Sequence, residues 1–298
     1  MTANFHPDLR RARMSPRSVV GPRTLGLTRW LTGLTGSRQP NGGTIIQVDD
    51  GVSARVFRPE TAANPTPALL WIHGGGYIMG SASMADRFCR TVADRFGVVA
   101  AAVEYRLAPE HPFPIPLEDC YSALRWLAAL PEVDDSRIAI GGESAGAGLA
   151  AALALLARDH GEIAPVFQAL SYPMLDDRTA SRTDIDPRRL RMWSPENNRF
   201  GWRSYLGPAG GDVPALAAPA RHPDLSGVAP AWIGVGTNDL FHDEDVAYAH
   251  RLRESGVPCE LHLVQGAYHG FDLTESKAAV SLSYREAMTA ALGRALAA

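Results

Sequence analysis

Hydrophobic residues occur along this chain in short continuous runs rather than in strict alternation with polar ones. Six runs have the length of buried strands, at 68–73, 98–105, 137–140, 167–172, 231–236 and 260–264. Such runs are typical of strands covered on both faces of a parallel sheet. Helical stretches lie between most of them, at 84–96, 117–130, 145–160, 243–254 and 276–296. This alternation predicts an α/β fold with a mostly parallel sheet and helices on both faces.

Two further β-rich runs precede the first buried strand, at 44–48 and 52–58, and they flank Asp49-Asp50-Gly51. Aspartate and glycine between such runs are typical of a hairpin turn. We therefore expect an antiparallel hairpin at one edge of the sheet, which brings the sheet to about eight strands.

The interval 175–223 does not fit the alternation. It is too long for a plain crossover loop and carries one methionine and several aromatic residues. Ser194-Pro195-Glu196 predicts a helix start, because serine caps the first free N–H groups and proline fits the first helical position. We expect a helical insertion above the sheet, in contact with the N-terminal segment and contributing to a substrate pocket.

Composition places the chain among ordinary globular enzymes. Its 298 residues are 46% hydrophobic and 20% charged, and the formal net charge of -3 argues against a general nucleic-acid binder. Cys89, Cys120 and Cys259 are odd in number and widely spaced, which argues against a disulfide framework or a metal site. We expect a reducing, cytoplasmic compartment.

No segment predicts membrane insertion or secretion. The first fourteen residues lack an apolar core, and the longest apolar run, 145–157, is too short to span a bilayer. The segment from Met1 to Pro40 is nevertheless basic, with seven arginines and one acid, Asp8. It could be a transit peptide or an anionic-surface contact. We favour an N-terminal helical cap with a solvated basic face.

The first candidate for chemistry is the serine of Gly142-Glu143-Ser144-Ala145-Gly146, between a predicted strand and an Ala/Leu-rich helix. In Gly-x-Ser-x-Gly, a sharp strand-to-helix turn strains the serine backbone and raises its hydroxyl above the sheet, while small neighbours relieve crowding. The N–H of Ala145 would then point toward an oxyanion. The alternative is an ordinary turn that happens to contain serine.

A rival interpretation overlaps this motif. Residues 146–151 fit G-x-G-x-x-A, the dinucleotide-binding fingerprint, and also open a helix after a strand. An alanine-rich helix produces such matches easily. A nucleotide site would also leave the other glycine and histidine motifs without a role.

A second glycine cluster, His73-Gly74-Gly75-Gly76-Tyr77, directly follows a predicted buried strand. Backbone N–H groups can stabilise a developing oxyanion only where absent side chains allow close approach. No G-K-[ST] follows, which argues against a phosphate loop. The cluster therefore predicts an oxyanion hole beside the serine.

His269 is the candidate base, because it follows the last predicted strand at the carboxyl edge of the sheet, where ligands gather. His73 and His111 fit scaffolding hydrogen bonds better. The histidines at positions 6, 160, 222, 250 and 262 fall in a strand, in helices or in proline-flanked loops. Asp239 ends a strand at the same edge and is the candidate orienting acid. Asp243 is the alternative, with helix capping as its more ordinary role.

The chain resembles the hormone-sensitive-lipase-like branch of the α/β-hydrolase esterases. The resemblance rests on His73-Gly74-Gly75-Gly76, on Tyr105-Arg106-Leu107-Ala108-Pro109-Glu110-His111-Pro112-Phe113-Pro114, on the serine motif, on Asp239-x-x-x-Asp243 and on His269-Gly270-Phe271. It implies Ser144 as nucleophile, His269 as base and Asp239 as its orienter. Gly75, Gly76 and Ala145 would donate to the oxyanion, with Gly74 as a further candidate.

The resemblance also implies a division of the chain. Segments 1–40 and 176–223 would form a helical cap, and segments 41–175 and 224–298 the α/β-hydrolase core, all within one structural domain. The expected activity is serine carboxylesterase, acting on small-molecule esters of short to medium acyl chains, without metal or organic cofactor. An amidase, lactonase or deacetylase with the same triad and a non-catalytic ligand-binding relative are the alternatives, and a homodimer is left open. Departures at Glu143, Tyr77 and 240–242 bear on specificity.

Overall fold

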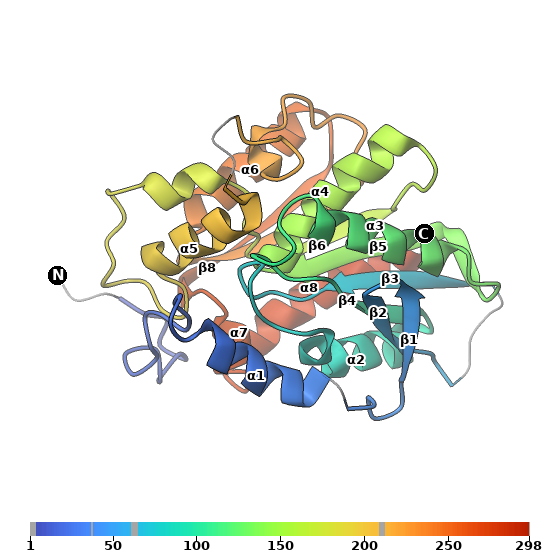
Figure 1. Cartoon of the computed structure of the whole chain (residues 1–298), viewed down its shortest axis with the longest axis horizontal. Helices are drawn as coiled ribbons and strands as arrows, with labels where there is room; N and C mark the ends of the chain where they lie inside the picture. Colours follow the sequence, from blue (N-terminus) through green and yellow to red (C-terminus); the bar gives the residue numbers. More distant parts are fainter. Residues whose placement is uncertain (1–3, 37, 61–64, 209–211, 298) are drawn as a thin grey trace.

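The computed structural model describes residues 4–36, 38–60, 65–208 and 212–297, and it is built around one eight-stranded sheet (Figure 1). The strand order is β1-β2-β4-β3-β5-β6-β7-β8. The strands are β1 (Thr44–Asp49), β2 (Val52–Phe57), β3 (Thr66–Ile72), β4 (Val99–Glu104), β5 (Val133–Glu143), β6 (Phe167–Ser171), β7 (Ala231–Asn238) and β8 (Cys259–Tyr268). The hairpin β1–β2 and its junction with β4 are antiparallel and all other pairs are parallel, which confirms the predicted α/β architecture.

Helices cover both faces of the sheet. One core forms under α3 (Ile115–Ala128), α4 (Ala145–His160) and α6 (His242–Glu254), and a second under α2 (Asp86–Phe96) and α8 (Ala279–Ala297). Short helical turns occur at η1 (Ala82–Ala85), η2 (Asp177–Ser181), η3 (Pro219–Arg221) and α7 (Phe271–Thr274). Among the described residues, no helix is both long and apolar enough to cross a bilayer.

Two strands are longer than their apolar runs indicate. β5 begins at Val133, where Thr66 of β3 pairs with it, although residues 134–137 are polar and partly or fully exposed. β8 continues to Tyr268 along β7, with an irregularity in the pairing after Gly236. In both places the pairing is interrupted and resumes at one outlying pair, Thr66 with Val133 and Asn238 with Tyr268, so the strand extends beyond the part that is buried on both faces.

Two helices lie outside these layers, α1 (Leu25–Gly36) and α5 (Pro195–Leu206). α5 confirms the predicted start, because the Ser194 side chain and Asn197 form a reciprocal capping box, with Pro195 at the first helical position. The same Asn197 interacts with Val19 and Val20 of the N-terminal segment. The insertion therefore contacts the N-terminal segment, as expected.

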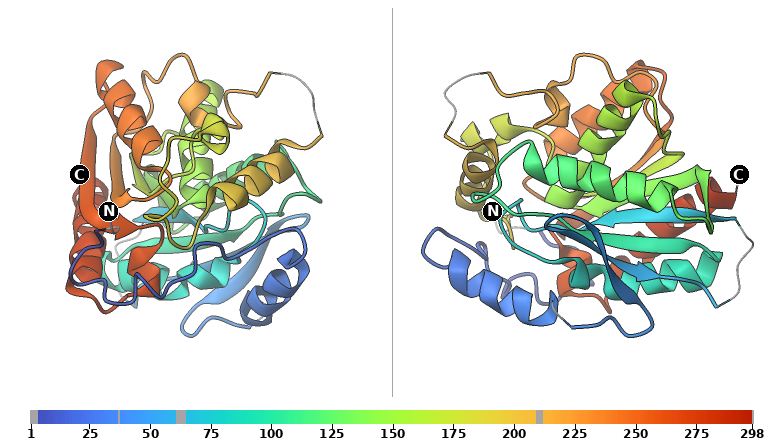
Figure 2. Two further views of the ribbon diagram at one scale, coloured as in Figure 1. Left: turned by 90° about the vertical axis from the view of Figure 1, so that its left-hand side faces the viewer. Right: turned by 45° about the vertical axis from the view of Figure 1, so that its right-hand side comes forward.

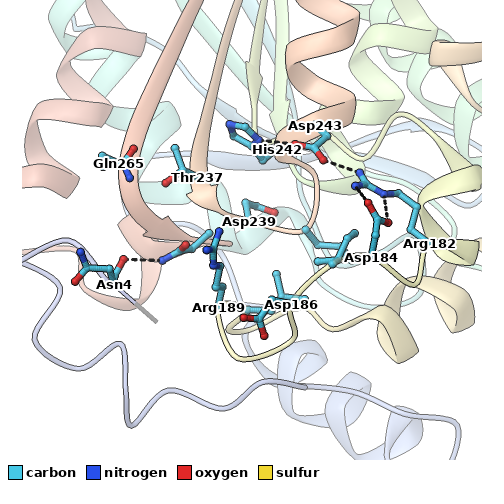
Figure 3. A pocket seen from close by; sticks show the side chains of 14 residues that line it. Asn4, Arg182, Asp184, Asp186, Arg189, Thr237, Asp239, His242, Asp243 and Gln265 are labelled. Atoms are coloured by element: carbon cyan, nitrogen blue, oxygen red, sulfur yellow. Dashed lines mark hydrogen bonds and ion pairs between the residues drawn. The ribbon is translucent and has the colours of Figure 1, made fainter. Parts of the chain in front are cut away.

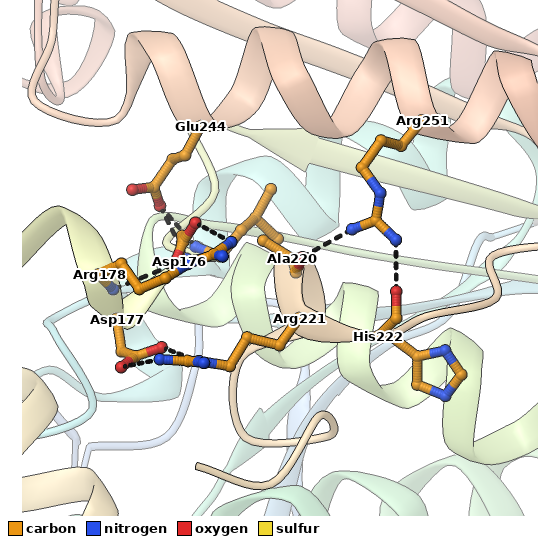
Figure 4. A network of polar contacts seen from close by, with 9 residues as sticks. Asp176, Asp177, Arg178, Ala220, Arg221, His222, Glu244 and Arg251 are labelled. Carbon is orange, nitrogen blue, oxygen red and sulfur yellow. Dashed lines mark hydrogen bonds and ion pairs between the residues drawn. The ribbon is translucent and has the colours of Figure 1, made fainter. Parts of the chain in front are cut away.

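The two ends of the insertion are tied to α6 (Figure 4). The Oε1 atom of Glu244 accepts the N–H groups of Leu175 and Asp176, at 2.7 and 3.1 Å. Near the other end, the guanidinium of Arg251 donates to the carbonyls of Ala220 and His222. Because α6 directly follows the loop that carries Asp239, these bonds fix the position of the insertion relative to that loop.

Candidate active site

Ser144 lies at the turn from β5 into α4, with φ 55° and ψ −123°, a backbone conformation that non-glycine residues rarely adopt. Neighbouring glycines allow this turn. A Cβ atom at Gly142 or at Gly146 would overlap the carbonyl oxygen of Ile72 in β3. The N–H of Ser144 donates to Ser171 O at 2.9 Å, which fixes the turn against β6. This is the strained elbow that the Gly-x-Ser-x-Gly pattern predicts.

His269 follows β8 directly, and its Nε2 lies 2.9 Å from Ser144 Oγ. Aromatic edges hold the imidazole: the Tyr172 ring is T-shaped against it at 4.9 Å between centroids, and the Phe241 ring at 5.2 Å. The serine and histidine come from loops 125 residues apart in the chain. The tertiary structure therefore brings together the two groups that sequence motifs predict separately.

Asp239 completes a hydrogen-bonded row. Its Oδ2 lies 2.8 Å from His269 Nδ1, and its Oδ1 accepts the N–H of Phe241 at 3.0 Å. Asp243 is directed elsewhere, because its carboxylate pairs with Arg182 at 2.7 Å and with His242 at 2.8 Å. All three members of the row are buried, with residue exposures of 6–7%. The geometry thus separates the two aspartates that the sequence left as alternatives.

A cleft of about 1020 Å³ opens beside the loop that carries Asp239 (Figure 3). The insertion contributes Arg182, Asp184 and Asp186 to its wall, and the N-terminal segment contributes Asn4. Arg182 bridges Asp184 and Asp243 across this cleft, so much of the charge on its wall is paired internally. The Asp239 side chain is fully buried, so this cleft borders the acid loop without exposing the carboxylate to solvent.

The glycine loop after β3 lies against the serine. A Cβ atom at Gly74 would stand 3.2 Å from Ser144 Cβ, so a side chain here would crowd the elbow. Gly75 and Gly76 have φ of 122° and 60°, and none of the hydrogen bonds within the described chain uses their N–H groups. Ala145 is the first residue of α4, where helical N–H groups have no partner inside the helix.

Gly74 differs from the two glycines after it. Its N–H is directed at the carboxyl group of Glu143, the residue before the serine. Burial and the nearby Asp272 raise the pKa of Glu143 to about 8, and the hydrogen bond from Gly74 opposes this rise. Glu143 is therefore neutral at pH 7, and Gly74 is a weaker candidate than Gly75 or Gly76 for binding an oxyanion.

His73 has a scaffolding position. It is fully buried, its Nδ1 lies 2.8 Å from Gly74 O, and its ring stacks on Tyr105 at 4.3 Å between centroids. Burial lowers the pKa of its imidazole to about 4, so the ring is neutral at pH 7 and shapes the glycine loop. His73 is not part of the hydrogen-bonded row of Ser144, His269 and Asp239.

Three residues beside the row were not singled out by sequence motifs. Trp193 is buried, its ring centre lies 6.4 Å from that of His269, and it occupies the space where a Cβ atom at Gly76 would point. Tyr172 has φ 37° and donates its hydroxyl to Asp272 Oδ1 at 2.8 Å. Asp272 lies three residues after His269, and this proximity is the only signal in the sequence that could have suggested it.

A serine at a strained elbow is followed along the chain by an aspartate and then a histidine, and the three form one hydrogen-bonded row. On a mostly parallel sheet with helices on both faces, this arrangement is typical of a serine hydrolase of the α/β-hydrolase class. A family model described as alpha/beta hydrolase fold matches residues 69–273. The chain belongs to this family, in its hormone-sensitive-lipase-like branch, as the sequence resemblance predicted, and it is a carboxylic ester hydrolase.

Individual relatives agree with this assignment. The chain is similar to Esterase LipI of Mycobacterium tuberculosis, with 35% identity over 74% of this chain and 71% of the relative. It is also 35% identical to an ethyl acetate hydrolase of Pseudomonas putida, over 73% of this chain and 70% of that protein. Among solved structures, a bacterial heroin esterase superposes with a TM-score of 0.87 at 38% identity, covering 98% of both chains.

Proposed function

We propose that this protein is a serine carboxylesterase that hydrolyses short- to medium-chain acyl esters through an acyl-enzyme intermediate. The observation that carries the proposal is the continuous row Ser144–His269–Asp239, with contacts of 2.9 and 2.8 Å. His269 Nε2 removes the proton from Ser144 Oγ as that oxygen attacks the ester carbonyl. Asp239 keeps the proton of the neutral imidazole on Nδ1 and stabilises the imidazolium that forms.

The two half-reactions use the same groups. Collapse of the tetrahedral intermediate breaks the carbon–oxygen bond of the ester, and the alcohol leaves with the proton held on His269. Water then enters, gives a proton to His269 and attacks the acyl-enzyme carbonyl. The acid leaves, and Ser144 regains its proton.

The oxyanion would be held by backbone N–H groups of Gly75, Gly76 and Ala145. The assignment is supported by the absence of other partners for these N–H groups among the described residues, by the positive φ of Gly75 and Gly76, and by the position of Ala145 at the start of α4. One donor of this kind is worth about 3 kcal/mol in the barrier of related reactions. Three donors from two loops would also fix the orientation of the carbonyl.

Acyl-chain length would be limited by a cap formed from segments 1–40 and 176–223. Ser144 and His269 are only 6% and 7% exposed, and Trp193 of the insertion fills the space over Gly76. A site enclosed in this way favours small acyl groups. The name of the Pseudomonas relative, ethyl acetate hydrolase, agrees with that preference.

A hydrolysis panel tests both the bond and the chain length. The substrates are p-nitrophenyl esters from acetate to palmitate, the matching p-nitroanilides and simple lactones, with Ser144→Ala as the control variant. We expect kcat/KM to peak between acetate and octanoate, little amide hydrolysis and near-complete loss in Ser144→Ala. Faster hydrolysis of anilides or lactones than of the esters would mean that an amide or a lactone is the preferred substrate. Undiminished turnover by Ser144→Ala would show that Ser144 is not the nucleophile.

A further inference from the structure

Positive charge is concentrated in one stretch of the chain that the catalytic proposal does not use. Residues 9–48 contain seven arginines and neither aspartate nor glutamate, whereas the rest of the chain has 22 basic against 32 acidic residues. The net charge of -3 is therefore the sum of a strongly basic segment and an acidic remainder of the chain. A segregation of this size implies a local field of one sign.

The structure leaves most of this charge open to solvent. The exposed arginines of the segment before α1 are Arg10, Arg11, Arg13, Arg17 and Arg23. Within the described part of the chain, their guanidinium groups take part in no ion pair. Elsewhere exposed arginines commonly have an acidic partner, as Arg95 does with Glu286. The five open guanidinium groups are thus available to an external anion.

α1 adds an exposed apolar face directly after these arginines. Leu27, Trp30 and Leu31 are 61%, 61% and 54% exposed. Their i, i+3, i+4 spacing places them on one side of the helix. In Figure 1, α1 lies at the lower edge of the molecule with the segment before it to its left, and in both views of Figure 2 α1 again lies on the outside of the molecule. The five arginines and this apolar face are named here the N-terminal surface.

The opposite side of α1 is fixed to the loops next to the active site. Arg29 donates to Ile78 O at 2.7 Å, to the Glu110 carboxylate at 2.8 Å and to Ala108 O at 2.5 Å. Ile78 follows the glycine loop by two residues. Anything that covers the outer side of α1 therefore lies beside the segment that leads into the active site.

We propose that the N-terminal surface docks on an anionic lipid surface, with the helix lying in the headgroup region and the arginines on lipid phosphates. Leucine and tryptophan on one side of a short helix, flanked by arginine, is the composition of interfacial helices. Each basic residue near an anionic leaflet adds to the attraction, which salt weakens. The apolar face favours lipid over nucleic acid, since a phosphate backbone offers nothing to cover Leu27, Trp30 and Leu31. The docking is peripheral and stands independently of the proposed acyl-chain preference.

Vesicle sedimentation of the full chain tests the proposal. The probes are vesicles of phosphatidylcholine alone and of equal parts phosphatidylcholine and phosphatidylglycerol. We expect binding to the anionic vesicles, at least tenfold weaker binding to the neutral ones, and a further decline with added salt. The triple variant Arg13→Gln/Arg17→Gln/Arg23→Gln should bind anionic vesicles at least tenfold more weakly.

A matched variant, Arg125→Gln/Arg203→Gln/Arg294→Gln, removes the same charge from exposed positions elsewhere and should bind like the wild type. Leu27→Ser/Trp30→Ser should lose binding while keeping p-nitrophenyl acetate turnover and thermal stability, because its side chains are already in solvent.

An equal loss of vesicle binding in both arginine triple variants would show that binding depends on net charge alone. It would overturn the N-terminal surface as the docking site. Binding of double-stranded DNA with the same arginine dependence, without vesicle binding, would assign a nucleic acid instead. A concentration-dependent dimer that Leu27→Ser/Trp30→Ser abolishes, again without vesicle binding, would assign a second copy of the chain.

Discussion

The two carboxylate oxygens of Asp239 have different partners, and this makes Asp239→Asn the most informative substitution. Oδ1 accepts the Phe241 N–H, and Oδ2 faces His269 Nδ1. An asparagine must keep its carbonyl oxygen toward Phe241, because a backbone N–H cannot pair with an amide NH₂. The NH₂ group then donates to Nδ1. The imidazole is forced to carry its proton on Nε2, where it can no longer accept the proton of Ser144.

The expected loss is large because nothing at the site can correct the tautomer. The Asp239 side chain is fully buried, so water cannot replace the missing acceptor. In serine hydrolases a wrong tautomer of this kind lowers kcat by about 10⁴, or about 5.5 kcal/mol of barrier. The size and shape of the side chain are unchanged, so the fold should survive.

The assay is kcat/KM for p-nitrophenyl acetate, with circular dichroism and thermal unfolding as checks on the fold. Asp243→Asn is the matched control, because Asp243 is half-exposed and bonded to Arg182 and His242 rather than to His269. We expect a loss of less than about threefold there, in line with the small value of exposed ion pairs. Asp239→Asn with more than a tenth of wild-type activity, or a loss in Asp243→Asn as large as in Asp239→Asn, would refute the assignment of the acid.

Three other changes test separate parts of the structure. Ser144→Ala should leave the melting temperature near that of the wild type and abolish labelling by an organophosphate, and mass spectrometry of the adduct would contradict the nucleophile if another serine were labelled. Trp193→Ala should raise kcat/KM for octanoate relative to acetate several-fold, because the indole occupies space over Gly76; an unchanged acyl-length profile would remove Trp193 from the pocket wall. Burial raises the pKa of Glu244 from 4.5 to about 8, so the folded state holds a proton that the unfolded state releases between those pH values, and stability falls as pH rises through that window. Glu244→Gln keeps the acceptor for the Leu175 and Asp176 N–H groups and should flatten this slope in chemical unfolding between pH 5 and 8; identical slopes would show that Glu244 is charged in the fold.

The order of strands and helices could be predicted from local pattern, because each buried strand needs apolar residues on both faces and the helical stretches fall between these runs. The Ser194 cap and the proline after it predicted the start of α5 in this way. The residues at which strands begin and end were harder to predict. β5 extends back to Val133 through the polar residues 134–137, because Val133 pairs with Thr66 of β3 across an irregularity in the register that no local pattern indicates.

In the candidate site, too, some residues could be predicted from local sequence and others could not. Motifs single out Ser144, His269 and the glycine loop, because elbow strain and close backbone approach require particular residues at fixed local spacing. Trp193, Tyr172 and the proximity of Glu143 to Asp272 carry no local signature. Their roles arise from contacts between segments far apart in the chain, and many residue types at those positions would give the same local structure.

The sequence by itself determined the α/β architecture and the strained serine elbow, since these depend on periodic burial and on local backbone geometry. The tertiary structure alone decided which aspartate faces His269, which glycine N–H groups have no partner among the described residues, and that Trp193 lies against Gly76. The physical reason is that hydrogen bonds between loops depend on distances and directions that a parallel sheet sets only after its strands have aligned.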